Sequence, residues 1–265
     1  MSALVSIIMP SYNTAPFIEE SIRSVLAQNY TDWELIIVDD ASTDNTDEVV
    51  QRVILSGAQA KSKDLPSSRI RYLKNDRNRC AAYSRNRALR EAKGKWIAFL
   101  DSDDLWAPEK LEKQIAFMTK NGYAFSYTRY EEIDENGKST GTIVGGPKHI
   151  TKTGMFNYCW PGCLTVMYDR EVVGDIQIAE IQKNNDYAMW LKICRKADCY
   201  LLAENLASYR KRTGSISNHS YMSLVKWHYK LYRDAEGMNP VESLFNTGRN
   251  LFFGVWKKIK HVGRG

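Results

Sequence analysis

Three carboxylates stand within four residues of this 265-residue chain, in the stretch FLDSDDLWAPEKL at residues 99–111. Asp101, Asp103 and Asp104 directly follow the apolar run WIAFL, and like charges at this spacing repel one another unless a positive group lies among them. Carboxylate oxygens suit Mg²⁺ or Mn²⁺, which usually keep open positions for substrate phosphates. The alternative is a loop in which one Asp caps a helix that starts at Pro108, and this explains one carboxylate of the three. The pattern favours a metal site.

Two further polar clusters follow apolar runs in the same way. Pro10 to Asn13 comes after ALVSIIM, and Asp39 and Asp40 come after WELIIV. A carboxylate at 39 or 40 could accept the imide N–H of a uracil ring, and Tyr12 could supply a stacking face. An ordinary capped loop explains these residues equally well, so both interpretations stay open.

Three arginines, Arg79, Arg85 and Arg87, lie before and within the helix predicted to follow the third strand. Arginine can hold a diphosphate through two parallel N–H···O bonds. A solvated position on a helix is as good an explanation for any one of the three.

Two common nucleotide motifs are missing from the sequence. The chain contains no GxGxxG. The stretch Gly137-Lys138-Ser139 resembles the end of a P-loop, but Glu132 stands where that loop needs a glycine. A classical dinucleotide or P-loop site is therefore not expected.

The elements that must position these residues alternate along the first hundred residues. Apolar, β-branched segments predict strands at 3–9, 33–38, 69–73 and 95–100, and a polar loop is predicted at 56–68. Helical spacing and start signals predict helices at 18–26, from a cap at Ser42 or Thr43 through Val53, and at 83–92. This alternation predicts an α/β fold with a parallel sheet and helices on both faces. Ligands bind such sheets at the carboxyl ends of the strands, where the polar clusters lie.

The pattern changes after Asp104. An amphipathic helix is predicted at 108–121, strands at 123–133 and 142–144 around a turn at 135–137, a helix at 186–196 and a short strand at 199–203. No internal repeat is present. The second half is therefore expected to be built differently from the first.

Four segments in this order, SIIMPSYN, IIVDDASTD, AYSRNRAL and GKWIAFLDSDD, resemble the nucleotide-sugar half of inverting GT-A glycosyltransferases of family 2. The resemblance is close over about residues 4–110 and looser to about 217. It implies a GT-A fold with a mostly parallel central sheet and helices on both faces. It also implies a nucleotide-sugar-binding half at 1–105 and an acceptor-binding half at 106–217 of the same domain. Composition adds a C-terminal helical extension, a basic, aromatic-rich tail at 218–265.

The same resemblance assigns roles to individual residues. Pro10, Tyr12 and Asp40 match positions around the uracil, with Asp39 as the alternative to Asp40, and Arg85 matches the basic residue near the diphosphate. Asp101 and Asp103 match the DxD motif that contacts the sugar nucleotide. The resemblance implies that Asp103 or Asp104 holds Mn²⁺ or Mg²⁺.

The segment KNNDYAMWLKI resembles a family stretch in which the acidic residue before the Tyr is the catalytic base. That position is Asp186, and an inverting transfer needs such a carboxylate to deprotonate the acceptor hydroxyl. The chain departs from the family in having Asn185 where Glu is usual. A helix N-cap is the alternative explanation of Asp186.

Three other residues are candidates for contacts in the site. Trp160 and Trp190 could stack on sugar rings or belong to the core, with nothing in the sequence to choose between them. Arg210, with the following GSIS stretch, resembles a family loop that closes over the site, where this arginine could touch the diphosphate.

The tail is a separate unit of composition. From His219 onward, eight Lys and Arg against three Asp and Glu give a net charge of +5, which leaves +1 of the total +6 for the first 218 residues. Apolar side chains near one helical face are Leu251, Phe252, Val255 and Ile259, and basic ones around them are Arg249, Lys257, Lys258 and Lys260. Such a segment is typical of an interfacial helix, so contact with an anionic membrane surface is expected. The alternative is a helix that packs on the catalytic domain. Nucleic-acid binding is not expected, since no recognised motif accompanies the charge.

The sequence also indicates a setting. No basic n-region with a long apolar stretch marks a signal peptide, so the chain is expected to be cytoplasmic and peripheral at the inner face of the cell membrane. The five scattered cysteines predict reduced thiols rather than a zinc site.

These features with the resemblance imply a metal-dependent, inverting transfer from a UDP-sugar to a lipid-linked or soluble oligosaccharide, forming a β-linkage in surface-polysaccharide assembly. The rivals are a Mg²⁺-dependent nucleotidyltransferase or phosphatase, and a membrane-associated nucleotide-sugar binding module without turnover.

Overall fold

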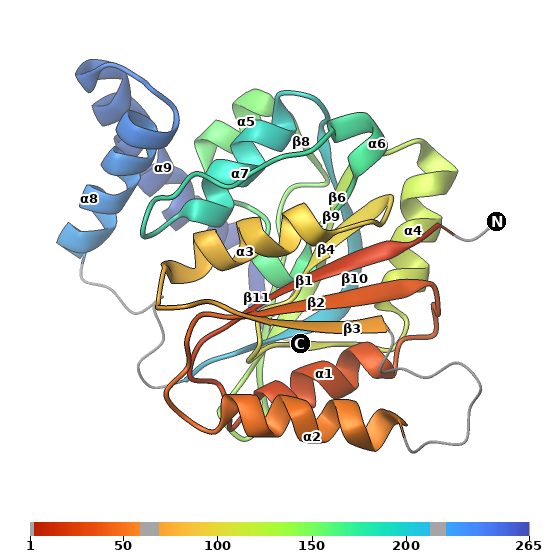
Figure 1. Cartoon of the computed structure of the whole chain (residues 1–265). Helices are drawn as coiled ribbons and strands as arrows, with labels where there is room; N and C mark the ends of the chain where they lie inside the picture. Colours follow the sequence, from red (N-terminus) through yellow and green to blue (C-terminus); the bar gives the residue numbers. More distant parts are fainter. Residues whose placement is uncertain (1–2, 59–68, 213–220, 265) are drawn as a thin grey trace.

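The computed structural model describes residues 3–58, 69–212 and 221–264, and at its centre lies one mixed β-sheet (Figure 1). The main path of the sheet runs β11-β7-β6-β9-β4-β1-β2-β3, with β10 bonded to β5, β6 and β8. The strands are β1 Val5–Ser11, β2 Trp33–Asp39, β3 Ile70–Lys74, β4 Trp96–Phe99, β5 Leu105–Trp106, β6 Phe125–Ile133, β7 Ser139–Val144, β8 His149–Ile150, β9 Met167–Asp169, β10 Cys199–Arg210 and β11 Val262–Arg264.

Helices cover both faces of this sheet, as predicted. The α-helices are α1 Ile18–Leu26, α2 Thr46–Ala58, α3 Cys80–Glu91, α4 Lys110–Asn121, α5 Lys152–Asn157, α6 Arg170–Val173, α7 Asn185–Cys194, α8 Tyr221–Lys230 and α9 Pro240–Lys260, with a 3₁₀ turn at Cys163–Thr165 and a π turn at Leu231–Ala235. Side chains alternate along β1, so Ile7 packs in one core cluster with residues of α1, α2 and α4, while Ile8 packs in the other with residues of α3 and α7. Figure 1 shows α1 and α2 below the sheet and α3 above it.

The first half of the sheet is parallel, as the alternation of strands and helices predicts. β1 lies between β2 and β4 and pairs with both in parallel, and β2 pairs in parallel with β3. All seven residues of β1 are buried, as expected for a strand with helices on both faces. The carboxyl ends of β1, β2 and β4 therefore meet at one edge.

The second half of the sheet is built differently from the first, as predicted, so the central sheet is mixed as a whole. β9 runs antiparallel to both β4 and β6, and β6 and β7 form an antiparallel pair around the turn that contains Gly137 at φ 81°. Among the later strands β10 alone makes a parallel pair, with β6, within the described residues. Strands β6 and β7 are joined by a hairpin, which pairs strands in opposite directions, whereas β9 reaches the sheet only after α5.

Two helix caps considered from the sequence do not form, and one of them was the alternative to a metal site at the DSDD segment. β5 lies between Asp104 and α4 and pairs with β10, so α4 begins at Lys110 with no side-chain cap and none of the three carboxylates caps it. Helix α2 begins at Thr46, whose N–H donates to Asp44 at 3.1 Å, and not near Ser42 or Thr43. In both cases the polar side chains that the local sequence suggests as helix caps form tertiary hydrogen bonds instead.

The C-terminal extension contains α8, α9 and β11. Strand β11 pairs with β7, so the chain returns to the sheet after α9. No helix among the described residues is long and apolar enough to cross a bilayer. All five cysteines are free, and Cys163, Cys194 and Cys199 are buried, in agreement with the predicted thiols.

Candidate active site

The uracil candidates lie at the carboxyl ends of β1 and β2. Pro10 is paired in register with Val38, and the N–H of Asp40 donates to the carbonyl of Ser11 at 2.8 Å. This pairing brings the segment after β1, with Tyr12, beside Asp40. Tyr12 is 44% exposed, so its ring is free to stack.

The two neighbouring aspartates have different surroundings. Asp39 is fully buried and accepts hydrogen bonds from the backbone N–H and the hydroxyl of Ser42. Asp40 accepts from the amide of Asn75 at 2.7 Å and from the backbone N–H of Arg79 at 2.9 Å. Each carboxylate has about four lone-pair sites, so both keep acceptor capacity. The structure therefore fixes Asp40 in place at the strand end that Tyr12 also reaches.

Arg85 connects three segments that are far apart in the sequence. From the middle of α3, its Nη2 donates to Asp101 at 2.6 Å and its Nη1 donates to the side-chain oxygen of Asn185 at 2.9 Å. Asp101 follows β4 and Asn185 begins α7. Burial disfavours the charge, but the Asp101 carboxylate keeps the pKa of Arg85 raised, so the guanidinium stays charged.

The other two arginines have different contacts. The guanidinium of Arg79 pairs with Asp76 at 3.0 Å, and that of Arg87 donates to the carbonyl of Lys74 and to Asn75. Of the three arginines, Arg85 is the one bonded to the DSDD segment.

The DSDD segment holds its carboxylates in three environments. Asp101 is bonded to Arg85, Asp103 lies 2.7 Å from Arg212, and Asp104 accepts from the backbone N–H of Arg210 at 2.9 Å. Burial and the Asp101 charge raise the pKa of Asp103, while burial and the charges of its two neighbours raise the pKa of Asp104 further. Each of the three carboxylates has an arginine beside it, but burial still opposes the ionisation of Asp103 and Asp104.

These carboxylates fit a divalent cation that shares its coordination with a ligand. Asp101 and Asp103 are partly exposed and each has one oxygen bonded to an arginine, whereas Asp104 is buried against β10. In the described residues no three His, Cys, Asp or Glu side chains gather as a complete metal site. Mg²⁺ is commonly held by one or two carboxylates together with substrate phosphates. The DSDD segment provides carboxylates of this kind.

Asp186 lies in the first turn of α7, one residue after the partner of Arg85. The N-cap position is Asn184, in the left-handed conformation at φ 59°, so the alternative that Asp186 is the N-cap is wrong. Burial raises the pKa of Asp186, against the effect of the nearby Arg85. A carboxylate with a raised pKa, next to the DSDD segment, has the properties of a general base.

The structure decides the alternatives left open for two tryptophans and one arginine. Trp190 is fully buried between Phe99 and Phe125, and Trp160 is buried with its ring N–H on the carbonyl of Gly154, so both belong to the core. The guanidinium of Arg210 is buried on the carbonyls of Asp103 and Glu135 and on the Glu20 carboxylate. The GSIS stretch lies outside the described residues.

Sequence reasoning missed two partners of the site. Arg212 pairs with Asp103, and Asn185 bonds Arg85 in place of the usual Glu. Arg212 gave no local signal, because its pairing depends on where β10 places it. Asn185 did give a local signal, since it is the one residue that departs from the family motif.

Comparisons with known proteins agree with this arrangement. The family described as glycosyl transferase family 2 matches residues 6–168. The UDP-Glc:alpha-D-GlcNAc-diphosphoundecaprenol beta-1,3-glucosyltransferase WfgD of Escherichia coli is 41% identical over 96% of this chain and 94% of its own.

Two solved structures share the fold. S. aureus TarS in complex with UDP-GlcNAc has a TM-score of 0.70 at 21% identity, covering 97% of this chain and 76% of that one. The mannosyltransferase PcManGT from Pyrobaculum calidifontis, in complex with GDP-Man and Mn²⁺, has a TM-score of 0.67 at 18% identity, covering 94% and 70%. The predicted GT-A fold is confirmed, and since the family match spans more than half of the chain, this protein belongs to glycosyltransferase family 2 and is an enzyme that transfers a sugar.

Proposed function

We propose that the enzyme transfers a sugar from a UDP-sugar to a hydroxyl of an acceptor sugar, with inversion and formation of a β-linkage. The observation that supports this most directly is the position of Arg85, bonded both to Asp101 of the DSDD segment and to Asn185 beside Asp186. One arginine thus joins the proposed donor site to the proposed base. The side chain of Arg85 contacts both the DSDD segment and the residue that precedes Asp186.

On the donor side, the ring of Tyr12 stacks on the uracil beside Pro10, and Asp40 accepts the imide N–H. Arg85 lies on the diphosphate side of the site, where its charge stabilises the negative charge of the leaving UDP. Asp101 orients Arg85 and, with Asp103, contacts the sugar nucleotide. Tyr12, Asp101 and Asp103 are exposed or partly exposed, while Pro10, Asp40 and Arg85 are buried behind them at the same edge of the sheet.

The proposed cofactor is Mn²⁺ or Mg²⁺, held by Asp103 with Asp104 close behind it. When bound, such a cation neutralises charge on the leaving diphosphate. The carboxylate oxygens of this segment are suitable ligands for such a cation. PcManGT, which shares the fold, was solved with Mn²⁺.

Asp186 is the proposed base. Its carboxylate takes the proton of the acceptor hydroxyl while that oxygen forms a bond to the anomeric carbon, and the bond from this carbon to the UDP oxygen breaks on the opposite face. The raised pKa of Asp186, caused by burial, makes the carboxylate a stronger base than an exposed aspartate. Inversion follows from the single displacement.

The proposed acceptor is a sugar on a polyprenyl diphosphate, in the assembly of a surface polysaccharide. The name of WfgD specifies UDP-glucose and a GlcNAc-diphosphoundecaprenol acceptor, and the high coverage of both chains makes this pair the first to test. We place the enzyme in the cytoplasm, peripheral at the inner membrane face, with its basic tail on the anionic surface. No nucleic-acid partner is proposed.

The test is UDP release from a panel of UDP-sugars with GlcNAc-diphosphoundecaprenol, in Mn²⁺, in Mg²⁺ and in EDTA. We expect turnover of one UDP-sugar with either metal, loss in EDTA, and a fall of at least about 100-fold in Asp103→Ala. Asp175→Asn, which changes an exposed carboxylate, is the matched control and should turn over normally.

Failure of every UDP- and GDP-sugar to react, with UDP still bound, would favour the binding module without turnover. Product that carries a nucleotidyl or phosphate group in place of a sugar would favour the nucleotidyltransferase or phosphatase rival.

A further inference from the structure

Helix α9 buries polar side chains and exposes apolar ones, which is the reverse of an ordinary surface helix. Its buried side chains are polar: Ser243, Asn246, Thr247 and Asn250. Seven of its large apolar side chains are exposed, namely Val241, Leu244, Phe245, Phe252, Val255, Trp256 and Ile259, with exposed fractions between 44% and 78%. A helix of a water-soluble domain normally has the opposite arrangement.

The apolar side chains form one continuous stripe. At 3.6 residues per turn they fall within an arc of roughly 120° that runs the whole length of this helix of about 31 Å. Arg249 and Lys260 lie along one side of this arc and Lys258 along the other. We call these seven apolar residues the outer face of α9. An exposed apolar stripe of this length marks a surface with a partner.

The polar inner face fixes which way the outer face points. Asn250 donates to the hydroxyls of Tyr187 and Tyr232, both buried. Lys257 donates to the carbonyl of Trp160 at 2.9 Å. An Asn239–Glu242 capping box begins the helix, and β11 after it joins the sheet. The helix is therefore anchored at its inner face and at both ends, and its apolar residues cannot turn inward.

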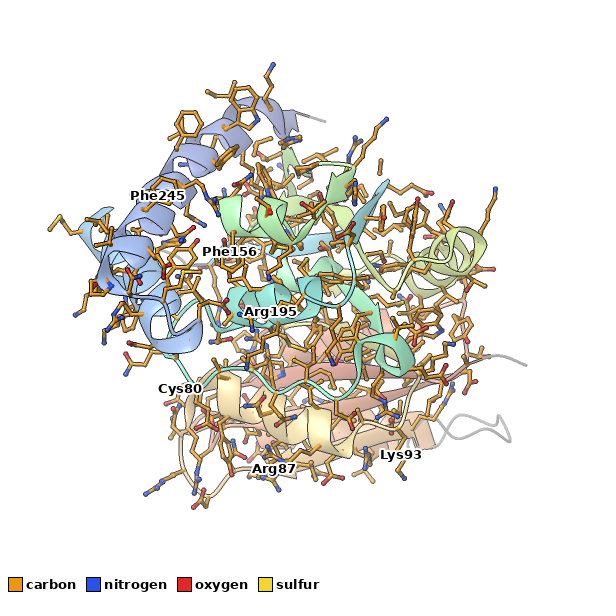
Figure 2. The ribbon with its side chains drawn as sticks, turned by 90° about the horizontal axis from the view of Figure 1, so that it is seen from above. Cys80, Arg87, Lys93, Phe156, Arg195 and Phe245 are labelled. Carbon is orange, nitrogen blue, oxygen red and sulfur yellow. The ribbon has the colours of Figure 1, made fainter. Side chains whose placement is uncertain are left out.

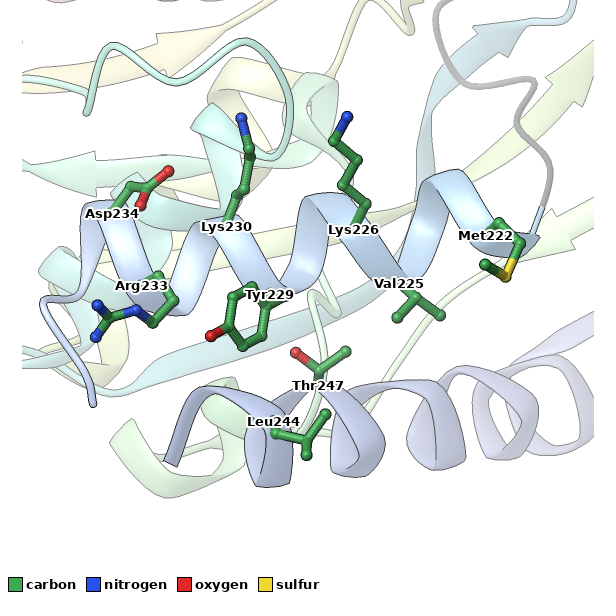
Figure 3. Close-up of a pocket in the computed structure, with 9 residues that line it drawn as sticks. All are labelled: Met222, Val225, Lys226, Tyr229, Lys230, Arg233, Asp234, Leu244 and Thr247. Atoms are coloured by element: carbon green, nitrogen blue, oxygen red, sulfur yellow. The ribbon is translucent and has the colours of Figure 1, made fainter. Parts of the chain in front are cut away.

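Helix α8 extends the same surface. Between α8 and α9 lies a groove of about 500 Å³, in which Val225 and Tyr229 point toward Leu244 and Thr247 (Figure 3). Met222 is exposed at one end of the groove, while Lys226 and Lys230 stand above it. Figure 2 shows both helices at one edge of the molecule, with Phe245 there. Apolar side chains are thus flanked by cations on both helices.

We propose that the outer face of α9, with the α8 groove, docks in the plane of an anionic bilayer. Apolar side chains insert at the boundary between headgroups and acyl chains, and the flanking Lys and Arg contact lipid phosphates. This charge pattern favours an anionic lipid surface over a second copy of this chain, since a copy would bring like charges together. The proposal rests on the proposed function for its purpose, which is access to a lipid-linked acceptor.

The docked orientation suits that purpose. Tyr187, the residue that Asn250 bonds, directly follows Asp186 in α7. The helix that lies on the membrane therefore contacts the helix that carries the proposed base. An acceptor held in the same membrane reaches the site without leaving its lipid surroundings.

The test is co-sedimentation of the full-length protein with vesicles of phosphatidylcholine alone or with 30 mol% phosphatidylglycerol, which needs no turnover. We expect binding to the anionic vesicles that weakens in 0.5 M NaCl, and a loss of at least about tenfold in Phe245→Ser/Ile259→Ser. Leu55→Ser on α2 removes an equally exposed apolar side chain and should bind as wild type. The Tm of each variant and UDP binding check the fold.

Equal binding of wild type and the double variant would overturn the proposal. So would a stable dimer in sedimentation equilibrium that the same two substitutions dissociate, because the outer face would then be a subunit interface. If vesicles bind as expected but no sugar nucleotide reacts, the docking surface stands and the proposed function fails.

Discussion

Asp186 shows how one residue acquires its chemistry from its surroundings. An exposed aspartate is a weak base, since its pKa is near 3.9. In the first turn of α7, burial raises that pKa, and the nearby charge of Arg85 opposes the rise. Asn185 accepts from Arg85 without adding a second negative charge. The Glu-to-Asn departure thus leaves Asp186 as the carboxylate of this motif.

We predict that Asp186→Asn lowers kcat by at least about 100-fold, because the amide cannot take the proton of the acceptor hydroxyl. In the wild type, kcat/KM should fall as pH decreases through the raised pKa of Asp186, since the base must be ionised. The measurement is a pH–rate profile with UDP binding by calorimetry at each pH. Unchanged kcat in Asp186→Asn would exclude it as the base.

At the scale of elements, β10 determines the shape of the DSDD loop. Its last residue, Arg210, donates its backbone N–H to Asp104, and its guanidinium holds the carbonyls of Asp103 and Glu135. The loop after β4 and the turn after β6 are therefore fixed by one buried side chain. This contact replaces the diphosphate contact considered for Arg210 from the sequence.

We predict that Arg210→Met lowers the free energy of unfolding by about 2–4 kcal/mol, because the carbonyls of Asp103 and Glu135 lose their hydrogen-bond donor. The comparison is Arg212→Met, which removes a partly exposed ion pair with Asp103 and should cost about 0–1 kcal/mol. Urea denaturation of both variants measures this difference. Equal losses would mean that the buried contacts of Arg210 contribute no more than the exposed pair.

At the scale of the whole molecule, the carboxylate cluster lowers stability at neutral pH. The pKa values of Asp103 and Asp104 are higher in the folded chain than in the unfolded one, so the folded state binds more protons. The free energy of unfolding contributed by these groups is thus greatest at low pH and falls as pH rises from about 4 through the raised values. A cation bound to the ionised cluster reverses this loss.

We predict that Mn²⁺ with UDP, at about 100 times the Kd, stabilises the wild type by about 2.7 kcal/mol and raises Tm by several degrees. Asp103→Ala should lose this gain. In EDTA at pH 7.5, Asp104→Asn should have a higher Tm than wild type, because an amide still accepts the Arg210 N–H without a buried charge. Thermal scans measure both effects, and a lower Tm for Asp104→Asn would contradict this account of the cluster.

The docking surface proposed on α9 and α8 is also a property of the whole molecule. The sequence indicates a basic amphipathic tail, but Leu251, expected on the apolar face, is only partly exposed, whereas Phe245 is fully part of the outer face. Helical periodicity alone predicts an apolar stripe on α9. The packing of Asn250 on Tyr187 and Tyr232 decides which side of the helix faces outward.

The sequence by itself determined the parallel half of the sheet, the order of its strands and helices, and the polar segments at the strand ends. Apolar strands followed directly by Asp39, Asp40 and Asp101 carry this information locally, because an apolar strand and its polar end differ in composition within a few residues. The family resemblance added the roles proposed for these residues, which remain to be tested by the variants above.

Only the tertiary structure decided the antiparallel pairing of β9, the pairing of Arg212 with Asp103, the burial of Trp160 and Trp190, and the junction of Arg85 with Asn185. The two polar contacts join residues that are 100 positions apart for Arg85 and Asn185 and 109 positions apart for Arg212 and Asp103. No local pattern encodes them, because each depends on the free energy of packing whole elements together. A side chain's partner is then set by where two distant backbones meet, and not by its neighbours in the chain.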